Sequence, residues 1–451
     1  MDNTAETLVS FTLETRFEML SEDTVDACKD RLLDTIGCIA AGYNHPIAAS
    51  SRSFSKKFRM DPSATILGDG VSASPDMAAF ANSVGIRILD MNDSYRVKSG
   101  GHPSDIVGAL FAGAELADSD GEAFLTAMAI GYEIYCSFCE AIDINSKGWD
   151  QPVCGVCASA LAVGRLINLN HAQLHHALSL ALIPNMAMIR TRHGQLSSWK
   201  GCAAANAARN GVFAALLAKS GFTGPEMPIE GKHGLWDIVG KFDWNISKNT
   251  SPYRVLGSDI KAFPICVHGQ TAAWVALELR KKFSAAQVKN IHIETYERAY
   301  EMMAMDPSRW SPTTRETADH SLPYVVAVAL LKGSIDEEVF APENLKNEEL
   351  TDLIGKISVN ATPALTALHP KKMPCQITIT LKNGRKYSHI LECQKGHPDN
   401  PMSYEELRSK FKKLFSKFGC THQADEVARL IKLTDNLPSI TPIIKSINRC
   451  D

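Results

Sequence analysis

The feature that most constrains the fold is an almost unbroken series of helical patterns over the first half of the chain. The stretch SEDTVDACKDRLLDTIGCIAAGY, which begins at residue 21, places Val25, Cys28 and Ile36 on one stripe, as in an amphipathic helix, and Gly42 marks its end. Further patterns of this kind cover residues 75–88, 104–117, 121–142, 155–167, 171–184 and 200–220. Their interiors are rich in Ala, Gly and Cys, so neighbouring helices can approach closely. The sequence therefore predicts an all-helical bundle.

The pattern changes around residues 251–264. Apolar and polar residues then alternate, as in strands, in VKNIHIETY, KISVNAT and QITITLKNGRKYSHI. The last of these predicts a hairpin with Asn383 and Gly384 at a two-residue turn. Helical segments such as SLPYVVAVALLKG lie between these strands, which indicates an α+β domain.

Helical patterns return near the C-terminus in SYEELRSKFKKLF and ADEVARLIKL. We therefore predict a mainly α protein. Its helical domain combines residues 1–258 with residues 398–451, and an α+β domain of residues 259–397 is inserted as a lid that could close over it.

Composition excludes several classes of function. The chain has 451 residues, 22% of them charged and 45% hydrophobic, and a formal net charge of -3, so it lacks the basic surface that nucleic-acid binding needs. It has neither an apolar run long enough for a membrane helix nor a basic amphipathic stretch, and its first 20 residues contain four acids and one arginine, unlike a presequence or signal peptide. We expect a soluble cytoplasmic protein. Without a P-loop or GxGxxG motif, a nucleotide cofactor has no support.

Two groups of residues raise the question of metal binding. Cys136, Cys139, Cys154 and Cys157 form two CxxC pairs, but both pairs resemble helix interiors, which favours reduced core thiols over zinc. The second group is His171 and His175 in NHAQLHHALSLAL, four residues apart on one helical face. Without an HExxH motif or a nearby acid, a surface or inter-helix role is favoured there.

The densest polar stretch is LDMNDSYRVKSGGHPSD, residues 89–105. His102 and Pro103 begin a new helix there, so the imidazole would lie at a helix N-terminus, which disfavours its cation and keeps a neutral base. The alternative is a capping loop with a hydrogen-bonded histidine.

Three further clusters combine cations with helix starts. Lys200, with Arg190, Arg192 and His193 before it, precedes an Ala-rich helix, as expected of a site for an anionic substrate. The other clusters are Arg315, His320 and Tyr324, and Lys261 with His268 at the predicted domain junction. Solvated loop charge, or packed polar residues at a boundary, are the alternatives.

Several of these segments resemble the MmgE/PrpD family, most of all its 2-methylcitrate dehydratase branch. The segments are LDMNDSYRVKSGGHPSD, SSWKGCAAANAARNGVFAALLA, EGKHGLWDI, TRETADHSLPYVVAVAL and KGHPDNPMSYEELRSKF, in collinear order over nearly the whole chain. The resemblance implies a helical domain made from both chain ends, an inserted lid, a homodimer, and catalysis without a metal or an organic cofactor.

The resemblance also implies roles for particular residues. It assigns catalytic positions to Asp90, His102, Lys200 and Tyr324. Our interpretation is that Lys200 faces the developing charge, that Asp90 orients His102 as proton acceptor, and that Tyr324 donates a proton, although acid and base are not distinguished. The expected substrate-binding residues are Ser94, Arg192, Lys261 and His268.

Two departures from the family pattern concern the substrate. Ser94 stands where threonine is more usual, and Trp149 and Asp150 occupy a stretch in which relatives often carry histidine. The expected reaction is dehydration of a hydroxy-tricarboxylate such as 2-methylcitrate, with citrate as a possible second substrate and propionate catabolism as the implied pathway. Decarboxylation of cis-aconitate and epimerisation of an iminodisuccinate-type acid remain open, as does a non-enzymatic zinc-binding or silent scaffold.

Overall fold

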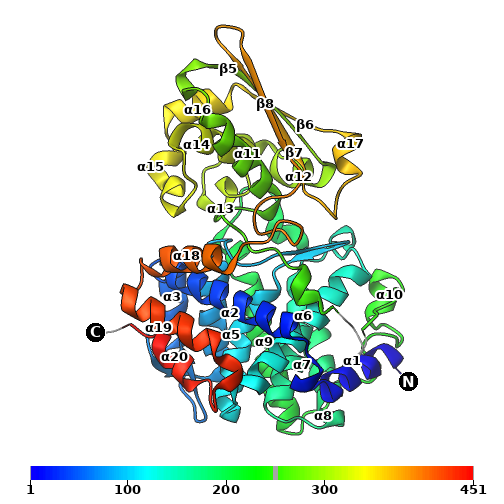
Figure 1. The fold of residues 1–451 in the computed structure, drawn as a ribbon. Coiled ribbons are helices and arrows are strands. Elements are labelled where there is room, and N and C mark those ends of the chain that lie inside the picture. Colours follow the sequence, from blue (N-terminus) through cyan, green and yellow to red (C-terminus); the bar gives the residue numbers. More distant parts are fainter. Residues whose placement is uncertain (1, 247–251, 450–451) are drawn as a thin grey trace. The chain divides into compact units, whose positions relative to one another are not determined.

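The computed structural model describes residues 2–246 and 252–449, so the change of pattern expected at Ser251 lies outside the described residues. The described residues are mostly helical, with a small mixed sheet (Figure 1), as the sequence predicts. They form two compact units. The first contains residues 2–190, 201–246, 252–260 and 403–449, and the second contains residues 191–200 and 261–402.

The first unit is a bundle of helices with two small antiparallel strand pairs. The helices are α1 (Asn3–Glu14), α2 (Glu22–Gly42), α3 (Pro46–Ser55), α4 (Pro75–Arg87), α5 (Val107–Ala117), α6 (Gly121–Ala141), α7 (Pro152–Leu166), α8 (His171–Leu182), α9 (Ala203–Lys219), α10 (Leu235–Val239), α18 (Tyr404–Phe415), α19 (Thr421–Lys432) and α20 (Thr441–Ile447). The strand pairs are β1 (Ala64–Ile66) with β2 (Val71–Ala73), and β3 (Tyr95–Arg96) with β4 (Gly100–Gly101).

Segments from both ends of the chain pack together in this unit. Helix α18 lies against α2 (Figure 1), and Lys410 of α18 forms a buried salt bridge of 2.5 Å with Asp34 of α2. Burial raises the pKa of Asp34, and Lys410 opposes that rise. The ion pair thus helps to hold the C-terminal helices on the N-terminal part of the bundle.

Small residues set the distance between helices α7 and α9. A Cβ added at Gly211 of α9 would lie 2.4 Å from the Cβ of Ser159 and 2.9 Å from the backbone nitrogen of Ala160, both on α7. No larger residue fits there without moving a helix. The close approach predicted from the Ala- and Gly-rich interiors is therefore confirmed at this contact.

The two CxxC pairs lie in helix interiors, as their apolar surroundings predict. Cys136 and Cys139 of α6 and Cys154 and Cys157 of α7 are fully buried. Burial raises the pKa of the Cys157 thiol to about 12, and raises the pKa values of Cys136 and Cys154 well above their ordinary value. Such thiols stay protonated and pack as small apolar groups.

The second unit is built on a four-stranded mixed sheet in the order β6-β5-β7-β8. Its strands are β5 (Val288–Thr295), β6 (Ile357–Ala361), β7 (Cys375–Leu381) and β8 (Lys386–Leu391), and only the β5–β6 pair is parallel. Its helices are α11 (Gln270–Arg280), α12 (Glu297–Met303), α13 (Arg315–Ala318), α14 (Leu322–Lys332), α15 (Pro342–Leu345), α16 (Glu348–Ile354) and α17 (Pro363–Thr366). Helices α11, α14 and α16 lie together beside the sheet (Figure 1) and share one apolar core with β5, β6 and β7.

The β7–β8 hairpin is confirmed, but its predicted two-residue turn is wrong. The N–H of Leu381 donates to the carbonyl of Arg385 at 2.8 Å, which leaves a three-residue loop, 382–384. Only Gly384 has positive φ, at 86°, whereas a two-residue type I′ turn requires positive φ at both central residues. The loop is therefore a turn closed by a left-handed glycine.

Most other predicted elements are also confirmed, within a few residues at their ends. Ser21 caps α2, which ends at Gly42 as predicted. The pattern at 104–117 divides into the 3-10 helix η2 (Pro103–Ile106) and α5. Among the described residues, no helix combines the length and apolar character needed to cross a membrane.

Candidate active site

His102 lies at the junction between the β3–β4 pair and α5, as the N-terminal cap of η2. Its Nδ1 is 2.7 Å from the carbonyl oxygen of Asp93, and its Nε2 is 2.9 Å from a guanidinium nitrogen of Arg87. A carbonyl only accepts hydrogen bonds and a guanidinium only donates them, so Nδ1 carries the proton and Nε2 presents a lone pair. The arrangement holds a neutral imidazole, the form that a general base needs.

Asp90 influences this histidine through Arg87. It follows α4 with a left-handed φ of 52°, and its carboxylate accepts a hydrogen bond of 2.6 Å from Arg87. The same carboxylate oxygen is 4.0 Å from Nε2 of His102, beyond hydrogen-bond distance. The orientation of His102 by Asp90 stays a prediction, and in the structure it would act through Arg87, whose guanidinium bonds to both groups.

A buried polar network fixes the loop around His102. Asp93 accepts hydrogen bonds from the Ser104 N–H at 3.0 Å and from the Tyr132 hydroxyl at 2.9 Å. Burial raises the pKa of Asp93, and it raises the pKa of Asp105 to about 7. Asn92 donates to Asp105 at 2.9 Å, so the segment before His102 is held by contacts with the residues that follow it.

Ser94 lies in the same segment and is buried, with 1% of its surface exposed. Its backbone forms a two-way bridge with Asp259, with hydrogen bonds of 3.0 and 2.7 Å. Arg96 clamps the Asp259 carboxylate with two further bonds of 2.5 and 2.6 Å. The structure thus brings Asp90, Ser94 and His102 together in one rigid segment of the first unit.

The stretch that lacks the expected histidine is connected to this segment. Trp149 pairs with Met188 in an isolated bridge, and Asp150 is buried at the start of α7. The next residue, Gln151, accepts a hydrogen bond from the Tyr135 hydroxyl, whose oxygen accepts the backbone N–H of His102 at 3.0 Å. The side-chain amide of Gln151 is therefore linked to the backbone of His102 through the hydroxyl of Tyr135.

Lys200 belongs to the second unit, where it binds Asp319. Its Nζ lies 2.9 and 3.2 Å from the two carboxylate oxygens, and both side chains are almost completely buried. Arg315 donates to the same carboxylate at 2.6 Å, and Nδ1 of His320 lies 2.5 Å from it. Asp319 thus organises two permanent cations and a histidine.

The charges around Asp319 fix its ionisation. Burial alone would raise the pKa of this carboxyl, but Lys200, His320 and Arg315 lower it to about 2. A carboxylate only accepts hydrogen bonds, so Nδ1 of His320 must carry a proton. His320 is therefore placed in the opposite electrostatic environment to His102.

The expected binding residues of the second unit have different surroundings. Arg192 donates to the Lys200 carbonyl at 3.5 Å, so it lies beside the Lys200 backbone. His268 is hydrogen-bonded through Nδ1 to the Tyr296 hydroxyl at 2.6 Å. Lys261 is buried, with 1% exposed.

Tyr324 lies in the apolar core of the second unit, with 2% of its surface exposed. Its hydroxyl donates to the carbonyl oxygen of Val339 at 2.6 Å, and burial raises its pKa. A hydroxyl that is bonded to a backbone carbonyl in a core has a packing role. The geometry therefore favours His320 over Tyr324 as the proton donor of this unit.

Sequence reasoning missed Arg87 and Asp319 and did not choose His320. Asp319 and His320 directly precede Ser321, the cap of α14, so an adjacent acid and histidine before a helix start was the available signal. Arg87 sits in the last turn of a predicted helix, where nothing in the sequence distinguished it from a surface cation.

Two family models match most of the chain. The MmgE/PrpD N-terminal domain model matches residues 6–246, and the MmgE/PrpD C-terminal domain model matches residues 263–436. The chain therefore belongs to the MmgE/PrpD family, as the resemblance in its sequence indicates.

Curated relatives of known activity belong to two kinds. A 2-methylcitrate dehydratase of Cupriavidus necator is 26% identical over 434 residues, which cover 89% of this chain and 88% of the relative. A cis-aconitate decarboxylase of Homo sapiens is 25% identical over 446 residues, covering 93% and 89%. A 2-methylcitrate dehydratase of Salmonella typhi is 28% identical over 402 residues, covering 83% and 82%. These relatives are enzymes, and the chain is an enzyme of the same family.

Proposed function

We propose that this enzyme is a hydro-lyase that dehydrates a hydroxy-tricarboxylate of the 2-methylcitrate type to the corresponding enoate. The substrate class comes from the names of the dehydratase relatives. The observation that carries the proposal is the opposite placement of two histidines, His102 against a guanidinium and His320 against a carboxylate. Environments that separate two titratable groups in this way mark one as base and the other as acid.

In the proposed reaction His102 is the base. The lone pair of Nε2 accepts a hydrogen bond from Arg87 in the structure, so that bond has to open before Nε2 can act. Nε2 then takes the proton from the carbon next to a carboxylate, and the electrons of that C–H bond form the carbon–carbon double bond. The bond to the hydroxyl group on the neighbouring carbon breaks. Hydroxide leaves with a proton from His320, so the products are an enoate and water, and the protons balance.

Positively charged side chains stabilise the negative charge that develops during this step. Removal of a proton next to a carboxylate creates a dianionic aci-carboxylate, which needs positive groups aimed at it. Lys200 has this role in the proposal, with Asp319 holding its ammonium group in place and Arg315 holding the Asp319 carboxylate. Arg192, Lys261, His268 and Ser94 are proposed to bind substrate carboxylates.

A second candidate is decarboxylation of cis-aconitate, which passes through a similar carbanion. The similarity to the human decarboxylase covers 93% of the chain, as much as any dehydratase match above, and Gln151 lies in the stretch where a histidine was expected. In that reaction the loss of carbon dioxide forms the carbanion, which is then protonated.

The decisive experiment is a screen of 2-methylcitrate, citrate, cis-aconitate and iminodisuccinate with the purified protein. Dehydration creates an ultraviolet-absorbing conjugated enoate, decarboxylation releases carbon dioxide, and epimerisation does neither. Turnover of 2-methylcitrate with a rise in absorbance supports the proposal, whereas carbon dioxide from cis-aconitate alone would replace it with the second candidate. The homodimer implied by the family remains a prediction, which light scattering can test.

A further inference from the structure

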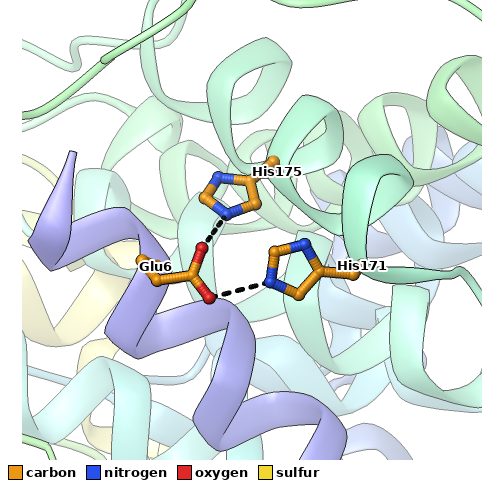
Figure 2. Close-up of side chains that lie close together, drawn as sticks. All are labelled: Glu6, His171 and His175. Atoms are coloured by element: carbon orange, nitrogen blue, oxygen red, sulfur yellow. Dashed lines mark hydrogen bonds and ion pairs between the residues drawn. The ribbon is translucent and has the colours of Figure 1, made fainter. Parts of the chain in front are cut away.

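Three side chains from two helices of the first unit converge outside the residues used above (Figure 2). Glu6 lies on α1, and His171 and His175 lie on α8. Nε2 of His171 is 2.8 Å from one carboxylate oxygen of Glu6, and Nε2 of His175 is 2.9 Å from the other. Both rings therefore point at the same carboxylate.

Both helices hold these side chains in position. The two histidines are four residues apart on one face of α8, and their ring centroids are 5.0 Å apart. A capping box of Asn170 and Gln173 fixes the start of α8 next to His171. The start of α1 is fixed as well, because Asp2 accepts the N–H groups of Ala5 and Ile229. Ligands on two anchored helices are preorganised.

We propose that Glu6, His171 and His175 bind a divalent transition-metal ion, Zn²⁺ first of all, which joins α1 to α8. Two imidazoles and one carboxylate are a donor set that zinc accepts. One donor atom of each residue lies within 4.8 Å of the other two. Tetrahedral zinc with bonds of about 2.0–2.2 Å separates its donors by roughly 3.3 Å. Donor atoms that now lie within 4.8 Å of one another therefore have to shift by at most about 1.5 Å.

The exposure of the cluster suits an ion with a bound water. The side chains of His171, His175 and Glu6 are 51%, 28% and 39% exposed. An ion can therefore enter from solvent, and a water molecule can complete four-fold coordination. Ser10 donates to Glu6 at 2.9 Å, which is the kind of second contact that orients a metal-binding carboxylate.

The cluster is also prepared electrostatically. Hydrogen bonds from His171 and His175 lower the pKa of Glu6 to about 2, so its carboxylate is ionised at any ordinary pH. The protons that now link Nε2 of each histidine to Glu6 have to move to Nδ1 when a metal binds to Nε2.

The alternative is a hydrogen-bonded clamp between α1 and α8 that takes no metal. To distinguish a metal site from a metal-free clamp, zinc binding by the dialysed, intact wild-type protein is compared with zinc binding by the variants His175→Gln and Glu6→Gln. Two variants are used so that a folding failure of one does not end the test. His176→Gln is the matched control, because His176 is the next residue on α8 and its Nδ1 instead accepts the Gly224 N–H at 3.3 Å.

The measured quantity is the difference in bound zinc between wild type and variant, since other groups such as Cys393 with His397 and Asp399 can also take up the ion. We expect each cluster variant to bind one equivalent less than wild type and to lose the zinc-dependent rise in melting temperature. The His176→Gln control should keep both, and all these variants should keep wild-type turnover. Equal zinc binding by wild type and both variants, or no zinc-dependent rise in the wild-type melting temperature, would overturn the proposal.

Discussion

At the scale of single residues, one neighbour sets the hydrogen-bonding role of each candidate catalytic histidine. Arg87 donates to His102, and Asp319 accepts from His320. Both neighbours are buried, so solvent screens these effects only weakly.

Exchange of each histidine for glutamine tests these roles through the pH dependence of kcat/KM. The base must be neutral and the acid protonated, so the wild-type profile should be bell-shaped. His102→Gln should remove the limb on the acidic side and His320→Gln the limb on the alkaline side, each with a loss of about a hundredfold or more. Profiles with both limbs intact in both variants would refute the assignment.

Asp319 should make the stability of the enzyme depend on pH. Its pKa is lowered from 3.8 to about 2, so its ionised form contributes stability at neutral pH that is lost as the pH falls from about 4 towards 2. The shift corresponds to a contribution on the order of 2 kcal/mol. Chemical unfolding of wild type and Asp319→Asn should differ by at least this amount at pH 7 and converge in acid. A difference that is independent of pH would contradict this account of the ion cluster.

Tyr324 should prove to be structural. Tyr324→Phe deletes a hydroxyl that donates to Val339 in the core, which should lower the free energy of unfolding by about 1 kcal/mol. Turnover should stay within a few-fold of wild type. A hundredfold loss of kcat with unchanged stability would instead restore the role of proton donor that we expected from the sequence.

At the scale of elements, the sequence pattern was enough to predict most long helices and all four strands of the sheet. The turn of the β7–β8 hairpin was not predicted correctly, since Asn-Gly fits more than one loop length. The short helices α15 and α17 were not predicted either, because short segments carry too few apolar positions for a period. Helix α1 was also missed, although it is as long as α18 and α19.

The contact between α7 and α9 offers a paired test of helix packing. Gly211→Ala places a Cβ 2.4 Å from Ser159 and should lower the free energy of unfolding by about 1–3 kcal/mol. Gly155→Ala on the facing helix is the control, because its nearest neighbour would be 3.5 Å away. It should be neutral, or stabilising by up to about 1 kcal/mol through helix propensity. Equal effects in denaturant unfolding would argue against tight packing at Gly211.

At the scale of the whole molecule, the sequence indicated the segments that we propose to carry chemistry, but not how their side chains pair. Lys200 and Asp319 are 119 positions apart, and Glu6 is 165 positions from His171. No local pattern indicates such pairs, because the fold creates them. Family membership, by contrast, follows from segments that keep their order along nearly the whole chain.

The measurement that tests the central claim most directly is the initial rate of enoate formation from 2-methylcitrate, followed by ultraviolet absorbance, for wild type and Lys200→Ala. Removal of the cation that faces the developing carboxylate charge should lower the rate by about a hundredfold or more in a protein that remains folded by circular dichroism. Absence of any enoate with the wild-type enzyme, or an unchanged rate in the variant, would contradict the account.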